Sequence, residues 1–144
     1  MVQRKQLCLY INTSMLIRAL EDPGAREFLG ECCSRHQCVV SSVHWREEWR
    51  RSTLTKLAGL LMGLGIATVE VNVEVLEEEA TSLIEERGWS PRRLVDLMHV
   101  LAAVELGCHG VIAIDRFMAR RAKEYGLLYV NQYTGCPKDG QALP

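Results

Sequence analysis

The sequence has no apolar run approaching the roughly 20 residues that a membrane-spanning helix needs, and no repeats or low-complexity segments. It also lacks an excess of either charge, since 17 lysines and arginines oppose 18 aspartates and glutamates. A protein-wide basic field is therefore excluded, and any nucleic-acid binding must depend on a local patch. Residues 1–6 are too short a leader to be a signal peptide, so we expect a cytoplasmic protein.

No two of the six cysteines form a C-x-x-C pair, which argues against a zinc ribbon or a thioredoxin-type motif. Cys8 and Cys38 fall within predicted strands, where we expect buried, reduced thiols, because neighbouring parallel strands rarely offer disulfide geometry. Cys32, Cys33 and Cys136 are predicted nearer the surface. Disulfides inside cells are characteristic of hyperthermophiles, so the sequence alone leaves the redox state open.

What the sequence does contain is a regular alternation of short apolar runs and amphipathic stretches. Strands are predicted at residues 7–12, 38–41, 66–71, 111–114 and 127–130. Helices are predicted at residues 13–20, 23–34, 43–63, 73–87, 90–106 and 116–125. Such alternation indicates a parallel sheet covered on both faces. We therefore predict a single-domain α/β protein, a three-layer α/β/α sandwich around a five-stranded parallel sheet, at 1–131, with 132–144 as a loop or partly disordered tail.

Polar side chains stand where several of the predicted strands end. Asn12 follows the first strand, and Glu47 comes shortly after the second. Asp115 follows the fourth strand, whereas Asp96 lies in a predicted helix. In a parallel α/β sheet, ligands gather beyond the carboxyl ends of the strands. We therefore expect these four side chains to converge in one pocket at that edge.

Four short motifs make the chain resemble the PIN domains, the nuclease fold of VapC-type toxins and of RNA-processing factors. In chain order they are Asn12-Thr13-Ser14 after a strand, Ser41 with Glu47 six positions on, Asp96 with His99 and Ala102 on a helix, and Asp115 after a strand. The gap of 19 residues between the two aspartates is also typical of the family. The motifs are individually common, but their order over roughly residues 7–130 is specific. The resemblance implies the PIN fold, which commonly dimerises.

The resemblance further implies a Mg²⁺- or Mn²⁺-dependent endoribonuclease that cleaves single-stranded RNA. The catalytic and metal-binding set would be Asn12, Glu47, Asp96 and Asp115. Such a set suits the chemistry because magnesium is a hard cation that prefers oxygen ligands. Ser14 and Ser41 would support it through hydrogen bonds. In the toxin branch of the family, a small antitoxin protein inserts a segment into the same groove, often through a basic side chain.

Two positions depart from the family. Asn12 stands where the family has its first aspartate, and Ala113 stands where it has threonine or serine. Asn12 still offers a carbonyl oxygen but no charge, so we expect weaker metal binding. Three interpretations remain open: an engineered silencing change, a tolerated natural ligand swap, or a catalytically degenerate domain that binds RNA or a protein partner.

A neutral protein that binds RNA needs local cations for the phosphates. The candidates nearest the predicted site are Arg92, Arg116 and Arg120, with an ordinary solvated helix surface as the alternative.

Four further residues have plainer interpretations. His99 is predicted to be a structural histidine near the site, and His44 to be a helix-start residue. Trp45 and Trp49 are predicted to make core or dimer contacts rather than to stack on bases.

Overall fold

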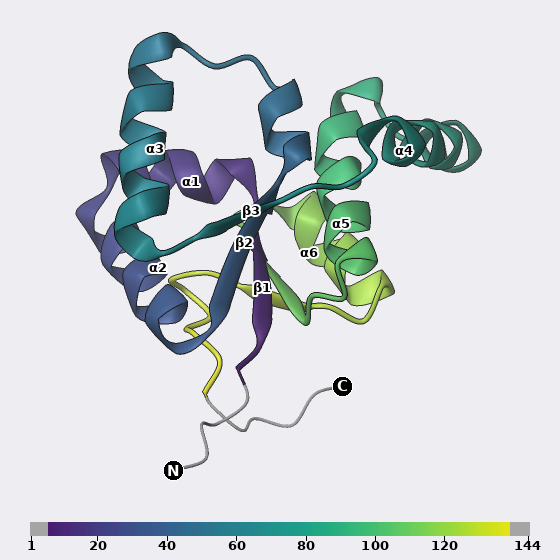
Figure 1. Cartoon of the computed structure of the whole chain (residues 1–144). Coiled ribbons are helices and arrows are strands. Elements are labelled where there is room, and N and C mark those ends of the chain that lie inside the picture. The colour runs from purple at the N-terminus through teal and green to yellow at the C-terminus, as the bar shows by residue number, and fades with distance from the viewer. Residues whose placement is uncertain (1–5, 139–144) are drawn as a thin grey trace.

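A computed structural model describes residues 6–138 of the chain and has a central sheet of five parallel strands (Figure 1). The strands are β1 (Cys8–Ile11), β2 (Gln37–Ser41), β3 (Ala67–Val69), β4 (Gly110–Ile112) and β5 (Leu128–Val130). They lie in the order β3-β2-β1-β4-β5, so β1 is central and contacts both halves of the sheet. The predicted strand number and parallel pairing are confirmed.

Six α-helices cover the two faces of this sheet. One face carries α1 (Thr13–Glu21), α2 (Pro23–Arg35) and α3 (Arg51–Leu64), and the other carries α4 (Val73–Arg87), α5 (Leu94–Glu105) and α6 (Arg116–Glu124) (Figure 1). Two 3₁₀ turns, η1 (Ser42–Arg46) and η2 (Pro91–Arg93), precede α3 and α5. The three-layer α/β/α architecture expected from the alternation is therefore confirmed.

The central strand β1 explains why the sheet is apolar on both sides. Leu9 and Ile11 face the core under α1, α2 and α3, whereas Tyr10 faces the core under α4 and α5. All three side chains are fully buried. A parallel strand covered on both faces needs apolar residues at every position, which is the pattern of its sequence.

The helix signals read from the sequence act as expected at most boundaries. The Asp22 carboxylate accepts a hydrogen bond from the Gly24 amide (2.9 Å) and begins α2. Ser90 caps in the same way, but Pro91 opens the short turn η2, and α5 begins only at Leu94. This offset places Arg93 at the junction of the two.

The single helix predicted over residues 43–63 is wrong. The chain forms η1, leaves helical conformation around Glu47, and begins α3 only at Arg51. The Trp49 indole N–H donates to the His44 carbonyl (2.8 Å). In a continuing α-helix, that carbonyl would instead accept from the backbone amide four residues later. The break leaves Glu47 on an extended link beside the sheet edge.

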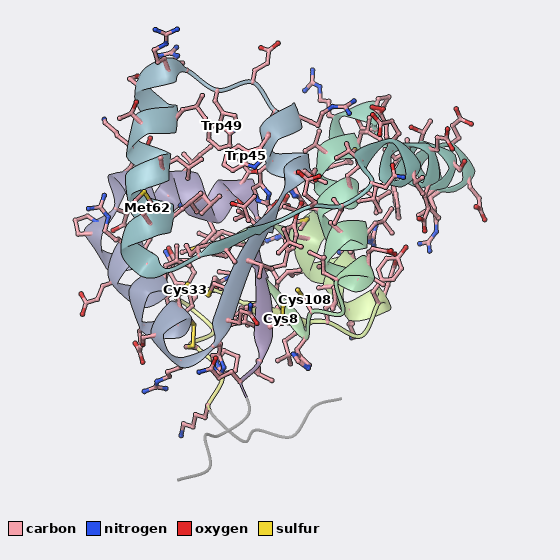
Figure 2. The ribbon with its side chains drawn as sticks, viewed as in Figure 1. Cys8, Cys33, Trp45, Trp49, Met62 and Cys108 are labelled. Carbon is pink, nitrogen blue, oxygen red and sulfur yellow. A yellow bond between two sulfur atoms is a disulfide. The ribbon has the colours of Figure 1, made fainter. Side chains whose placement is uncertain are left out.

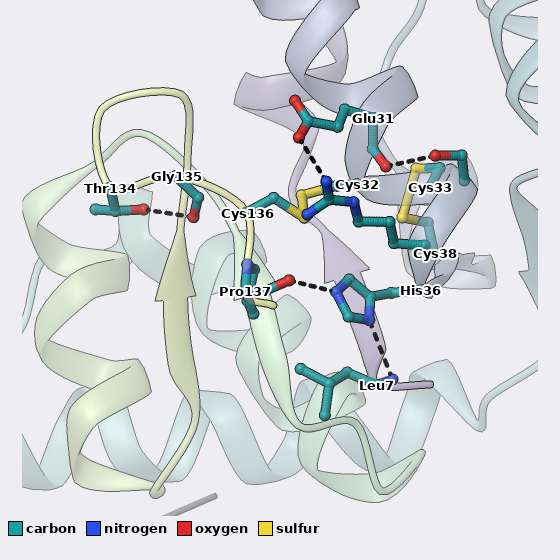
Figure 3. The surroundings of a disulfide bond; sticks show 12 residues. Leu7, Glu31, Cys32, Cys33, His36, Cys38, Thr134, Gly135, Cys136 and Pro137 are labelled. Carbon is teal, nitrogen blue, oxygen red and sulfur yellow. Dashed lines mark hydrogen bonds and ion pairs between the residues drawn. A yellow bond between two sulfur atoms is a disulfide. The ribbon is translucent and has the colours of Figure 1, made fainter. Parts of the chain in front are cut away.

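The predicted reduced state of Cys38 is also wrong, because Cys38 forms a disulfide with Cys33 (Cα–Cα 5.3 Å). A second disulfide joins Cys32 to Cys136 (Cα–Cα 5.6 Å), and Cys32 is fully buried rather than near the surface (Figure 3). Both Cα separations lie in the usual range for disulfides. The strand neighbours β1 and β2 were predicted correctly.

Residues 132–138 of the predicted tail form turns and loop, whereas 139–144 lie outside the described residues. Besides the Cys136 disulfide, His36 Nε2 lies 2.6 Å from the Pro137 carbonyl, and its Nδ1 accepts from the Leu7 amide (3.3 Å) (Figure 3). His36 therefore joins the start of β1 to the segment after β5. Cys8 and Cys108 are free thiols with Sγ atoms 2.6 Å apart, side by side in Figure 2.

Within residues 6–138, none of the helices combines the length and the apolar character needed to cross a membrane.

Candidate active site at the carboxyl edge of the sheet

Asn12 is fixed where β1 ends and α1 begins. Its amide donates to the Ile112 carbonyl at the end of β4 (2.9 Å), and it stands at the N-cap of α1. Its side chain is buried, with Nδ2 donating to Ser14 Oγ (3.2 Å). Asn12 Oδ1 is buried and has no hydrogen-bond partner. Because an orphaned buried acceptor is costly, this oxygen marks a position suited to a cation or a donor.

Asp96 and Asp115 come from different elements and share one ion-pair partner, the guanidinium of Arg93. Asp96 lies in the first turn of α5, and Asp115 is the N-cap of α6, where its Oδ1 accepts from the Phe117 amide (2.9 Å). Arg93 Nη1 lies 3.4 Å from Asp96 Oδ2 and 3.2 Å from Asp115 Oδ2. Burial, and then the charge of Asp115, raise the pKa of Asp96. The two carboxylates therefore lie close enough to repel each other.

Glu47 belongs to a buried hydrogen-bonded chain that runs beneath the same edge. The Thr13 hydroxyl donates to the Glu47 carboxylate, and His99 Nε2 lies 3.1 Å from the same oxygen. His99 Nδ1 lies 2.7 Å from the Tyr10 hydroxyl, which lies 2.6 Å from Ser41 Oγ. Burial raises the pKa of Tyr10, so its hydroxyl stays protonated and can donate. The chain holds the Glu47 carboxylate in one orientation.

The helix α5 connects these two groups. Asp96 and His99 are three residues apart on one helical face, so α5 contributes one residue to each group. Asn12 adjoins Thr13, which contacts Glu47. The four predicted residues thus lie around one edge, but in two separately bonded groups: Glu47 with His99, and the two aspartates with Arg93.

The donor set fits a hard divalent cation, although incompletely. Among residues 6–138, no group of three or more His, Cys, Asp or Glu side chains is arranged to hold a metal ion. Two carboxylates are close together, and the third oxygen donor at this edge is the unpartnered amide oxygen of Asn12. Carboxylate and amide oxygens are ligands that Mg²⁺ and Mn²⁺ accept.

The arginines predicted to contact RNA are exposed near this edge. Arg116 begins α6 directly after Asp115, Arg120 follows one turn later, and Arg92 lies in η2 next to Arg93. All three side chains are therefore accessible to solvent.

The predicted supporting residues and tryptophans have specific contacts. Ser14 accepts from Asn12, and the buried Ser41 hydroxyl accepts from the Val43 amide (3.2 Å) at the start of η1. Trp49 packs against the core under α1, α2 and α3, whereas the Trp45 side chain is 42% exposed (Figure 2). His44 is a helix-start residue as predicted, because it is the N3 residue of the capping box of η1, and it is also fully buried and hydrogen-bonded at both ring nitrogens.

Sequence reasoning did not predict the contacts that three residues make at this edge: Thr13, Tyr10 and Arg93. Thr13 stands in the first motif, and Tyr10 falls within the first predicted strand. For Arg93 a signal existed, since an arginine three residues before an aspartate on a helix can pair with it.

No family model matches the chain, and no curated protein matches it. Among solved structures, a chain of VapBC2 from Rickettsia felis, determined bound to a DNA fragment from their promoter, superposes with a TM-score of 0.64 at 12% sequence identity. The match covers 87% of this chain and 98% of that chain. Together with the strand order, it shows that the chain has the PIN-like α/β fold that its motifs predict.

Proposed function

We propose that this chain is a divalent-metal-dependent endoribonuclease for single-stranded RNA, with a metal site weakened at Asn12. The observation that carries the proposal is the pairing of Asp96 and Asp115, from two different elements, with a single guanidinium nitrogen. Such a pairing puts one carboxylate oxygen of each aspartate within 3.4 Å of the same cationic nitrogen. The unpartnered oxygen of Asn12 at the same edge supplies a third donor. The fold shared with VapBC2 supports this assignment.

Each group of residues has its own task in this proposal. Asp96, Asp115 and Asn12 would hold Mg²⁺ or Mn²⁺, which supplies an activated water and offsets charge on the phosphodiester. Glu47, oriented by Thr13 and His99, would accept a proton from the attacking water or complete the ligand set. The exposed arginines at the mouth, Arg92, Arg116 and Arg120, would bind the flanking phosphates.

We further infer that the chain acts as the toxin of a toxin–antitoxin pair. The support is the similarity to a chain of VapBC2 and an apolar groove beside α3. The groove is lined by Trp45, Leu54, Ala58, Leu61, Met62, Ile66 and Thr68, of which Met62 is 83% exposed (Figure 2). An exposed apolar surface of this kind suits an antitoxin segment or a second copy of the chain.

The test is to restore the missing charge. Asn12→Asp should bind Mn²⁺ on the order of tenfold more tightly, because a carboxylate attracts a divalent cation more strongly than an amide does. Cleavage of a fluorogenic single-stranded RNA should rise with it. Calorimetric titration and the cleavage assay would measure the two effects.

Two control chains isolate the position of the charge. Asn72→Asp adds the same charge at the exposed N-cap of α4 and should change neither readout. The double variant Asn12→Asp with Asp96→Asn should lose what the single variant gained. Unchanged metal affinity and no cleavage in Asn12→Asp would contradict the nuclease assignment.

A second function is favoured by one observation. The single positive charge of Arg93 already offsets one of the two aspartate charges, and Asn12 carries no charge, so the edge is less anionic than a metal site usually is. A catalytically degenerate domain that binds RNA or a protein partner would have this character. Metal-independent RNA binding by both the given chain and Asn12→Asp, without cleavage, would favour that alternative.

A further inference from the structure

Arg93 occupies the position between the two aspartates as a consequence of its backbone. It is the last residue of η2 and the residue before α5, with φ −87° and ψ 2°. From there its Nη1 atom reaches Oδ2 of both Asp96 (3.4 Å) and Asp115 (3.2 Å). One nitrogen therefore serves two carboxylates that come from different helices.

An aromatic ring holds the guanidinium in this place. Arg93 Cζ lies 4.9 Å from the ring centroid of Phe117, within the range of a cation–π contact. Phe117 is fixed in turn by Trp89, whose ring meets it edge-on with centroids 5.3 Å apart, and by Arg121 at 4.9 Å. The Phe117 amide also donates to Asp115. The ring and the carboxylate that Arg93 contacts thus belong to one rigid segment.

The two carboxylates need a cation between them. Two carboxylates that share one nitrogen lie close enough to repel each other, and a guanidinium between them offsets part of that repulsion while keeping its own proton. The oxygens that Arg93 contacts, one on each aspartate, are also the hard donors that a divalent ion would use. Arg93 is 42% exposed, so its side chain has solvent into which it can withdraw.

We propose that Arg93 is an internal counter-ion that a divalent metal must displace from Asp96 and Asp115, so that this arginine sets the metal affinity of the site. The proposal rests on the proposed metal-dependent function. In the free protein, both aspartates are then already paired with Arg93 before any metal ion binds. Metal then binds by exchange with the guanidinium rather than by filling an open carboxylate pair.

The experiment compares Mn²⁺ affinity by calorimetry in three chains: the given chain, Arg93→Gln and Arg92→Gln. Arg93→Gln should bind Mn²⁺ on the order of tenfold more tightly, because the competing cation is gone. Arg92→Gln removes the same charge from the exposed neighbouring position and controls for net charge. Its affinity should stay within about threefold of the given chain. Circular dichroism melting of each chain verifies that it is folded.

A second measurement needs no substitution. In the ¹⁵N-labelled given chain, Mg²⁺ should shift the Arg93 Nε–H resonance as the ion pairs break, while the Arg35 resonance, whose ion pair is with Glu31 on α2, should stay unchanged.

The outcomes separate this proposal from the function on which it rests. Equal affinities in the given chain and Arg93→Gln, both abolished by Asp96→Asn, would keep the metal site and overturn the role of Arg93. The same conclusion follows if Mg²⁺ binds without moving the Arg93 resonance. Absence of any Mn²⁺ binding that depends on Asp96 would overturn both the metal site and the competition for it.

Discussion

At the scale of the residue, His44 is a fully buried titratable side chain beside the site. Its Nε2–H donates to the Ile11 carbonyl (2.7 Å), and its Nδ1 accepts from the Ser41 amide (3.1 Å). The ring lies 4.2 Å from the ring of His99. Burial, and then the proximity of His99, lower the pKa of His44 to about 3. His44 is therefore a neutral side chain that links the ends of β1 and β2 through its two ring hydrogen bonds.

The stability of the protein should consequently fall with acid. The pKa of His44 is depressed from 6.5 in the unfolded chain, so its stabilising contribution is complete above 6.5 and is lost as the pH falls toward 3. The slope from this one group approaches about 1.4 kcal/mol per pH unit within that window. Urea unfolding at a series of pH values would measure it. His44→Gln should give a flatter profile, and an equally steep one would contradict the assignment.

The candidate site was predictable at the residue level where backbone position decides it. Asn12 and Asp115 follow neighbouring strands, so the parallel sheet alone brings them to one edge. The hydrogen-bond and ion-pair partners within the site were not predictable. Those of Arg93, for example, depend on the conformation of its long side chain. Likewise, the chain from Ser41 through Tyr10 and His99 joins residues up to 89 positions apart, a pairing that only the fold creates.

At the scale of the element, β4 contains a glycine, Gly110, at a position where a side chain would collide with the neighbouring strands. A Cβ on Gly110 would lie 2.9 Å from Leu128 Cβ, 3.0 Å from the Leu128 carbonyl oxygen and 3.2 Å from Leu9 Cδ2. Two of these atoms are backbone or Cβ atoms that cannot rotate away. The strand therefore approaches β5 more closely than any other residue type would allow.

Gly110→Ala should lower the free energy of unfolding by about 1–3 kcal/mol, the usual cost of forcing extra atoms into a packed region. Gly59→Ala is the matched comparison, because Gly59 lies in α3 and a Cβ there meets nothing within 4 Å. That variant should gain about 0.5–1 kcal/mol, since alanine is the better helix former. Chemical denaturation of both variants would measure the two changes in the free energy of unfolding, which should have opposite signs. A neutral Gly110→Ala would mean that β4 and β5 separate easily.

The one element that sequence reasoning misjudged shows why periodicity has limits. Trp45 and Trp49 are four residues apart, a spacing that favours a helical face. In the structure, Trp49 instead uses its indole N–H to end η1 at the His44 carbonyl. A side chain that competes for a backbone acceptor interrupts a helix without any change in the apolar pattern.

At the scale of the whole molecule, the Cys32–Cys136 disulfide ties α2 to the segment after β5 across 104 residues of chain. In the chain-entropy description, cross-links across long loops restrict the unfolded state most. The Cys33–Cys38 disulfide spans only 5 residues and should contribute less. The fold class was predictable from the alternation of elements, but a link between such distant residues was not.

Cys136→Ser should therefore lower the free energy of unfolding by about 2–4 kcal/mol under oxidising conditions. Cys33→Ser with Cys38→Ser should cost less, because the loop it opens is short. Thermal unfolding with and without reductant would measure both. If reductant leaves the melting temperature of the given chain unchanged, the disulfides do not determine its stability.

The central position of β1 also determines when, during synthesis, the sheet can be completed. Leu9 pairs with Gly110, so after β1 has been synthesised about 100 further residues must follow before its second neighbour exists. At ordinary rates of synthesis, that wait is roughly 5–20 s. During it, β2 can cover one edge of β1, but the other edge remains an open template for foreign strands. The nascent chain is consequently most prone to wrong strand pairing in the interval before β4 is made.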